Sequence, residues 1–246
     1  MDRLLYVSMT GASHNAKAQT LHSHNLANAR TTGFRADLAQ ARSVQVFGEH
    51  FPSRAYSLTE NPGTDFRPGS LLQTGRDLDV AIEGEGFIAV EGPNGEEAFT
   101  RAGDFIIDDL GNLKTATGTP VLGNGGPIVI PPFEKLEIGT DGTVSIRGQG
   151  QTPEALTQVN RIKLVNPDTS LIAKGSDGLL RRKDGLIEPE AAGIQLASGF
   201  LENSNVNAVS EMTEILALSR QFELQVKMMK TAEENDQTSA RLLQVN

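Results

Sequence analysis

The two ends of the chain carry the pattern that most constrains its fold. From Leu4 to about Ala29 there is no proline and one glycine, and from Ala208 to Leu243 there is neither. In both segments apolar or small residues recur at alternating steps of four and three positions, the spacing of one face of a helix. We therefore predict a long α-helix at each end of the chain.

On each predicted helix these recurring positions form one packing face, which we call the seam. The two seams differ in how much apolar surface they offer. The seam positions are Leu5, Met9, Ala12, Ala16, Gln19, Ser23 and Leu26 in the first helix, and Ala208, Met212, Ile215, Ser219, Phe222, Val226 and Met229 in the second. Small and polar residues weaken the first seam, whereas Leu216 and Leu218 widen the second. Gly33 is expected to end the first helix in a left-handed conformation, and Asn205 or Asn207 can cap the second.

The middle of the chain has a different periodicity. Short β-rich runs alternate with dipeptides suited to tight turns. The runs are Val80–Ile82, Gly86–Val90, Phe105–Ile107, Ile128–Ile130, Thr143–Ile146 and Arg161–Val165, and the dipeptides are Asn94-Gly95, Asp141-Gly142, Asp177-Gly178 and Asp184-Gly185. This pattern predicts an antiparallel, hairpin-rich β domain.

The expected fold is therefore α+β, with a coiled-coil-like domain of terminal helices and a central β domain. We assign residues 1–33 and 205–246 to a terminal helical assembly domain, and residues 77–204 to the β-rich central domain. Residues 34–76 carry Pro52, Pro62-Gly63 and Pro68-Gly69, and we interpret them as an extended connector, with strand pairing of its own left open.

The β domain is expected to form a core of its own, so the two amphipathic helices need other surfaces on which to pack their seams. Isolated helices of this length are only marginally stable in water. The simplest arrangement is that they meet each other and then neighbouring subunits. The alternative is a helix pair packed on one sheet face within the chain.

Composition excludes several functions. With 22 basic against 31 acidic residues the net charge is −9, which argues against a duplex-binding surface. The absence of cysteine excludes thiol catalysis and cysteine-ligated metal. No apolar run reaches the roughly 18 residues of a membrane helix, and the N-terminus has no pattern of a cleaved signal.

No candidate catalytic or metal site survives comparison with a simpler explanation. His22 and His24 point to different helix faces, so with His14 we interpret them as a solvated face rather than a metal site. Gly84-Glu85-Gly86 lacks the third glycine of a dinucleotide motif and is better explained as a turn.

The acidic residues also favour structural roles. Asp104, Asp108, Asp109 and Asn112 lack the calcium-loop pattern, and residues 109–112 are interpreted as a hairpin turn. Asp77 and Asp79 are expected on one side of a strand, with no sign of an acid/base pair. We expect no active site, no cofactor and no metal.

Four segments resemble the flagellar rod and hook proteins. They are Asn25–Arg35 (NLANARTTGFR), Asp77–Val90 (DLDVAIEGEGFIAV), Phe99–Gly123 (FTRAGDFIIDDLGNLKTATGTPVLG) and Gly199–Met212 (GFLENSNVNAVSEM), in the family's order. Hook proteins are normally much longer. The segments MDRLLYVSM and SRQFELQVKMMKTAEEND are most similar to the proximal rod subunit adjoining the distal rod, since the distal protein usually has Tyr in place of Phe222.

The resemblance implies a structural, axial protein of the flagellar basal body. Such subunits leave by the flagellar type III export apparatus without a cleaved signal and polymerise helically into a hollow, torque-transmitting shaft that crosses the periplasm. Terminal helices line the inside of the tube and β domains lie outside. The implied partners are copies of the chain and neighbouring proximal and distal rod subunits, with no nucleic acid and no membrane span.

The expected assembly residues combine the helix seams with the motif residues. Asn25 and Asn28 can bond backbone at a helix end, Phe34 can anchor the exit into the core, Asn203 and Asn205 can cap the last helix, and Glu202 and Glu211 favour its positive end. The expected set is Leu5, Met9, Ala12, Ala16, Asn25, Leu26, Asn28, Gly33, Phe34, Asn203, Asn205, Met212, Ile215, Leu216, Phe222, Val226 and Met229.

Three alternatives remain open from the sequence. The first is the distal rod protein of the same family. The second is a non-flagellar β-rich protein that binds carbohydrate or peptide and oligomerises through helical arms. An enzyme is the third and least favoured.

Overall fold

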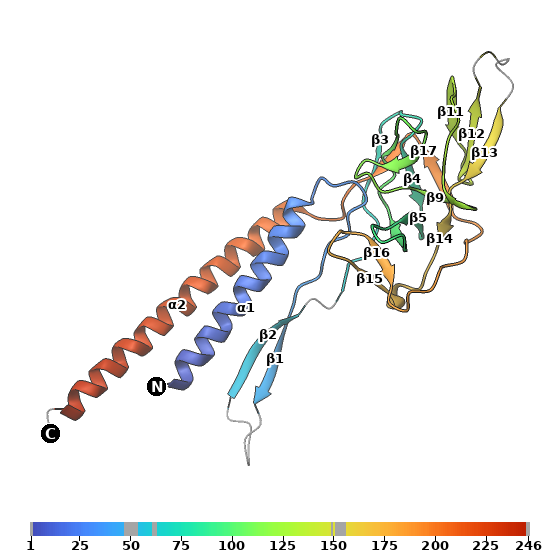
Figure 1. Ribbon diagram of the computed structural model, residues 1–246. Helices are drawn as coiled ribbons and strands as arrows, with labels where there is room; N and C mark the ends of the chain where they lie inside the picture. Colours follow the sequence, from blue (N-terminus) through green and yellow to red (C-terminus); the bar gives the residue numbers. More distant parts are fainter. Residues whose placement is uncertain (1, 47–53, 61–62, 149, 151–155, 245–246) are drawn as a thin grey trace. The chain divides into compact units, whose positions relative to one another are not determined.

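The computed structural model describes residues 2–46, 54–60, 63–148, 150 and 156–244. Pro52 and Pro62, two of the prolines that suggested an extended connector, lie outside these residues. The chain forms two compact units, one comprising residues 1–28, 37–63 and 206–246, and the other residues 29–36 and 64–205. The predicted α+β class is confirmed, with a helix at each end and antiparallel strands between them (Figure 1).

The first unit is built on the two terminal helices. Helix α1 spans Asp2–Ala27 and α2 spans Ala208–Gln244. They lie side by side and antiparallel (Figure 1). The His22 ring is bonded to Glu211 near one end of the pair, and Gly11 faces Gln225 in the middle. An uninterrupted run of helix-compatible residues, without proline, explains the length of both helices.

A β-hairpin completes this unit. Strands β1 (Gln40–Val46) and β2 (Arg54–Glu60) pair antiparallel over seven residues, from Gln40 opposite Glu60 to Val46 opposite Arg54. The hairpin contacts α1 through Thr59, whose backbone N–H donates to His14 Nδ1 at 3.1 Å and whose hydroxyl donates to the His14 carbonyl at 3.3 Å. Part of the predicted connector is therefore paired strand that packs with the helices.

The second unit consists of short antiparallel strands. Their bounds are β3 Leu71–Gln73, β4 Val80–Glu83, β5 Phe87–Glu91, β6 Glu97–Thr100, β7 Phe105–Ile107, β8 Leu113–Thr115, β9 Leu122–Gly123, β10 Gly126–Pro127, β11 Lys135–Ile138, β12 Thr143–Arg147, β13 Thr157–Arg161, β14 Leu164–Val165, β15 Ile172–Lys174, β16 Leu180–Arg182, β17 Gln195–Ser198 and β18 Phe200–Glu202, with a 3₁₀ turn at Thr169–Leu171. The largest sheet has the order β14-β5-β6-β16-β15 and the next β11-β12-β13, while β17-β4, β18-β3, β7-β8 and β9-β10 form pairs.

Strand β5 separates two hydrophobic clusters. Ile88 and Val90 point into the larger cluster, which includes Phe105 and Val144. Phe87 and Ala89 point into the smaller one, with Phe99, Val165, Ile172 and Leu180. A strand that is buried on both faces needs a continuous apolar run, which explains why β5 does not alternate polar and apolar residues.

Most of the predicted strands and hairpin turns are confirmed. Asn94-Gly95, Asp141-Gly142 and Asp177-Gly178 lie in the turns of the β5–β6, β11–β12 and β15–β16 hairpins. Residues 109–112 lie in the connection between the paired strands β7 and β8, as expected. Within the described helices, none is long and apolar enough to cross a membrane.

Three local predictions are wrong. Ile128–Ile130 makes only a single bridge, from Val129 to Asn112, and Arg161–Val165 is divided between β13 and β14. Asp77 and Asp79 do not share a strand face, because residues 77 and 78 form a turn that leaves Asp77 exposed and buries Asp79. Turn geometry overrides the strand periodicity in these places.

Candidate assembly site

The fully buried side chains of α1 and α2 are small or polar. In α1 the buried residues are Ser8, Ala12, Ala18 and Asn25, and in α2 only Ala232 is buried among the side chains described. A Cβ added to Gly11 would lie 3.1 Å from the Gln225 side chain, so the helices approach closely there. No large apolar side chain is therefore fully buried among the described residues of the two helices.

The predicted seams largely face away from this interface. Met9 is 49% exposed and Leu5 37%, and on α2 Met212 is 53% and Leu216 61% exposed. Phe222 and Val226 are also exposed, as is Ala16, whereas Leu26, Ile215 and Met229 are half-buried and Ala12 is buried. We call the exposed apolar residues Leu4, Leu5, Tyr6, Met9, Val209, Met212, Leu216, Phe222, Leu224, Val226 and Met228 the outer stripe. The sequence seam thus combines residues that the fold separates onto inner and outer faces.

The interpretation of the histidines as a solvated helix face holds for His24, which is 52% exposed, but is wrong for His14 and His22. His22 Nδ1 lies 2.6 Å from Glu211 Oε2, with both side chains mostly buried, and His24 Nδ1 lies 3.4 Å from Asp37 Oδ2. His14 accepts a hydrogen bond from the Thr59 backbone. Each histidine therefore connects α1 to another segment of its unit, a role that depends on tertiary neighbours and leaves no trace in helical spacing.

Asn25 fixes the chain segment that follows the helix. Its Oδ1 accepts from the Asp37 N–H and its Nδ2 donates to the Asp37 carbonyl, both at 2.9 Å. Asn28 Nδ2 donates to the His24 carbonyl at 2.9 Å, at the C-terminal end of α1. A buried amide that pairs with both the N–H and the carbonyl of one residue leaves neither of these backbone groups unsatisfied.

Gly33 does not end α1, which stops at Ala27. It has φ +67°, and its N–H donates to the Glu202 carbonyl at 2.8 Å. A Cβ at this position would lie 2.3 Å from the Ala102 nitrogen, so no larger residue fits. Phe34 is buried beside it, and Lys174 Nζ lies 3.8 Å from the centre of its ring.

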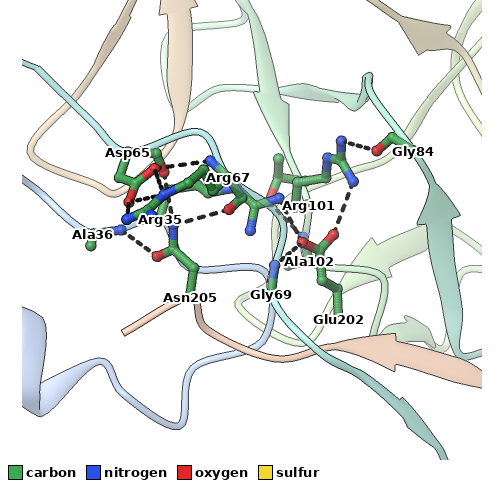
Figure 2. Close-up of polar contacts among 11 residues, drawn as sticks. Arg35, Ala36, Asp65, Arg67, Gly69, Gly84, Arg101, Ala102, Glu202 and Asn205 are labelled. Atoms are coloured by element: carbon green, nitrogen blue, oxygen red, sulfur yellow. Dashed lines mark hydrogen bonds and ion pairs between the residues drawn. The ribbon is translucent and has the colours of Figure 1, made fainter. Parts of the chain in front are cut away.

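A buried cluster of charges lies next to this turn (Figure 2). Glu202 is 1% exposed and accepts hydrogen bonds from Arg35 Nη2 at 2.6 Å, Arg101 Nη1 at 3.0 Å and the Gly69 N–H at 2.8 Å. Arg101 also donates to the Gly84 carbonyl and lies over the Phe87 ring. Burial lowers the pKa of the Arg101 guanidinium, and Glu202 opposes this shift. Arginine nevertheless keeps its charge in proteins.

The predicted roles of Glu202, Asn203 and Asn205 at the start of α2 are wrong. Asn207 caps the helix, since its Oδ1 accepts from the N–H groups of Val209 at 3.0 Å and Ser210 at 3.2 Å. Glu211 does lie in the first turn, as expected.

The two other asparagines join chain segments of the second unit, and Figure 2 shows the contacts of Asn205. Asn205 accepts from the Ala36 N–H and donates to the carbonyls of Asp65 and Arg67. Asn203 Nδ2 donates to Ser70 Oγ at 3.2 Å. Four residues of the sequence motifs, Gly33, Arg35, Glu202 and Asn205, therefore meet around the segment from Asp65 to Gly69.

Sequence reasoning missed Arg35 and Arg101. Both stand inside the segments NLANARTTGFR and FTRAGD, where a charged residue next to glycine and phenylalanine was the available signal. The described residues contain no group of His, Asp and Glu that could hold a metal ion. Gly84-Glu85-Gly86 forms a bend between β4 and β5.

Comparison with known proteins identifies the family. Residues 81–146 match the family described as Flagellar hook protein FlgE/F/G D1 domain, and residues 197–242 match Flagellar basal body rod FlgEFG protein C-terminal. The Flagellar basal-body rod protein FlgF of Salmonella typhimurium is 36% identical over 252 aligned positions, which cover 100% of both chains.

Other relatives agree. FlgF of Caulobacter vibrioides is 34% identical over 100% of both chains. The Flagellar basal-body rod protein FlgG of Buchnera aphidicola subsp. Schizaphis graminum is 31% identical over 97% of this chain and 98% of its own. The chain therefore belongs to the flagellar basal-body rod protein family, as a structural subunit of the proximal-rod type.

Proposed function

We propose that this subunit polymerises helically with copies of itself and with neighbouring proximal and distal rod proteins through the outer stripe of its helix pair. The hollow shaft built in this way transmits torque. The observation that carries the proposal is the outer stripe itself, a set of large apolar side chains on both helices that stay exposed in the described chain.

The contrast between the two faces of the helix pair supports this proposal. The fully buried side chains of the pair are small or polar, whereas many of its leucine, methionine and phenylalanine side chains are exposed. Burial of apolar surface contributes roughly 25 cal/mol per Å², and a large exposed apolar patch marks an interaction surface. Covering the outer stripe with helices of neighbouring subunits, in coiled-coil-like packing, would supply the missing stabilisation.

The predicted assembly residues divide between two roles under this proposal. Leu5, Met9, Met212 and Leu216 contact neighbouring subunits, and the motif residues Asn25, Asn28, Gly33, Phe34, Asn203 and Asn205 fix the segments that connect helices to β structure. Residues 1–33 and 205–246 act as the assembly domain, 34–76 as the connector and 77–204 as the central domain.

The proposal also covers the setting of the subunit. Under this proposal the subunit functions without catalysis and leaves the cell through the flagellar export apparatus. It then forms part of the rod where the rod crosses the periplasm. Family membership supports each of these statements, since the relatives named above are rod proteins.

A substitution in the outer stripe tests the proposal. Leu216→Asp places a charge on the stripe, and we expect it to abolish incorporation into basal bodies and swimming while the second unit remains folded. The matched control is Gln221→Asp, which places the same charge at an exposed polar position of the same helix. Normal swimming of the Leu216→Asp strain would contradict the assembly model.

A further inference from the structure

The turn between β7 and β8 forms one side of a recess in the second unit, whose lining combines apolar side chains with polar groups that include Asp108 and Asp109. The recess has a volume of about 330 Å³ and is lined chiefly by Ile107, Leu110, Ile130, Pro131, Pro132 and Phe133. A volume of this order matches binding pockets, which start at about 300 Å³. Leu110, on its rim, is 81% exposed.

The turn is held rigidly. Asp108 accepts hydrogen bonds from the N–H groups of Leu110 at 3.0 Å and Asn112 at 2.8 Å, and from Lys114 Nζ at 2.7 Å. The side-chain bond from Asn112 holds the pKa of Asp108 well below its usual value. Asp109 is exposed and makes no ion pair with any residue in the described part of the chain. The recess is therefore preformed and carries an unneutralised carboxylate.

A second rigid feature of the same unit has the complementary character. Leu186 is 63% and Ile187 77% exposed, next to each other on the loop after β16. Arg182 fixes this loop through ion pairs to Asp184 at 2.6 Å and to Glu188. Two adjacent exposed aliphatic residues on a rigid loop contribute nothing to the core of the subunit.

The loop also carries an available cation. Lys183 is exposed, and its Nζ donates to the Ser170 carbonyl at 2.7 Å, with no carboxylate partner among the described residues. The loop thus combines two aliphatic side chains with a positive charge, and the recess combines apolar walls with a negative charge.

We propose that the Lys183–Ile187 loop of one copy docks into the 107–111/130–133 recess of a second copy, with Leu186 and Ile187 against the apolar walls and Lys183 facing Asp109. The two surfaces are different patches of one rigid unit, so the contact is heterologous. A heterologous contact that does not close into a ring generates a helical array. This inference rests on the proposed function and adds a second contact, between β domains, to the contact between helices.

Cross-linking tests the docking directly, because the chain has no cysteine of its own. The double variant Leu110→Cys/Ile187→Cys is expressed in a strain lacking the wild-type subunit, and isolated basal bodies are treated with a short bismaleimide. Both side chains are exposed, so neither substitution should disturb the fold. We expect covalent dimers and higher multimers from the double variant, and no multimers beyond a dimer from either single variant.

The outcomes separate this inference from the function on which it rests. If the double variant is present in basal bodies and gives no cross-linked species, the docking is overturned and the rod function stands. If even the wild-type chain is absent from isolated basal bodies, both proposals are overturned.

Charge exchange gives an independent measurement. We expect Asp109→Lys and Lys183→Asp each to lower the cross-linking yield about two- to fivefold, and the two together to restore it, as for a pair at an interface rim. Asp77→Lys, at another exposed aspartate of the same unit, should leave the yield unchanged. If the variant with both exchanges loses as much cross-linking yield as the two single losses combined, the pairing of Lys183 with Asp109 is overturned.

Discussion

Replacing Glu202 by glutamine removes the carboxylate that is hydrogen-bonded to two buried arginines. Glu202 accepts three hydrogen bonds, from Arg35, Arg101 and Gly69, and the three charged side chains are 5% exposed or less. Glutamine keeps one acceptor oxygen, but its NH₂ group is a donor that faces an arginine donor. The variant therefore loses at least one charge-assisted bond and leaves two buried guanidinium groups without the carboxylate that is hydrogen-bonded to both.

The expected cost follows from this arrangement. Removing one partner of a buried ion pair destabilises a protein by about 3–5 kcal/mol, because the remaining charge stays buried. That is a large fraction of the 5–15 kcal/mol by which domains are typically stable. By contrast, replacing all three residues by apolar ones of similar size (Arg35→Met, Arg101→Met and Glu202→Leu) should cost much less, because no unpaired charge remains.

Hydrogen–deuterium exchange, measured on the full chain, can be read at amides that lie in the second unit. Amide exchange in β5 and β12, at the centre of the core, should accelerate by roughly two to three and a half orders of magnitude in Glu202→Gln, since about 1.4 kcal/mol corresponds to a factor of ten. Glu134→Gln is the matched control, because Glu134 pairs with Arg147 at 3.4 Å while its side chain is 56% exposed, and should change exchange little. An acceleration of less than tenfold in Glu202→Gln would refute the reasoning.

Three further predictions concern local structure. Gly33→Ala should lower the melting temperature of the second unit markedly because of its positive φ and the backbone 2.3 Å away, whereas Gly118→Ala, which has the strain of a positive φ but open space around it, should lower it by less. Asn207→Ala should cost about 1 kcal/mol in helix stability by circular dichroism, and Asn207→Asp should keep the cap. Hydrogen bonding to Arg182 lowers the pKa of Asp184 from 3.8 to about 2, so its stabilising contribution should be present above pH 4 and disappear as the pH falls through about 2, as measured by NMR titration of its carboxyl carbon.

The sequence predicts well those features that depend on local chemistry. Long stretches without proline and with at most one glycine predicted both helices, and aspartate- or asparagine-glycine pairs predicted hairpin turns such as that at Asn94-Gly95. These signals come from backbone preferences of single residues, which tertiary contacts seldom reverse.

Features that depend on distant neighbours could not be predicted in the same way. Helical spacing combined Met9 with Ala12 in one seam, although the fold exposes the first and buries the second. Glu202 and Asn205 precede a helix, and their position suggested capping, but their partners are Arg35 and Ala36, far away in the sequence. Capping rules identify side chains able to bond backbone groups, and the fold decides which backbone groups are near.

The assembly through the outer stripe is tested most directly by the accessibility of Leu216. A cysteine introduced there is the only one in the chain, and its reaction with a maleimide can be measured in the purified subunit and in isolated basal bodies. We expect rapid labelling in the purified subunit, where Leu216 is 61% exposed, and strong protection in the basal body. Equal labelling in the two states would show that the stripe stays open in the assembled rod and would contradict the account.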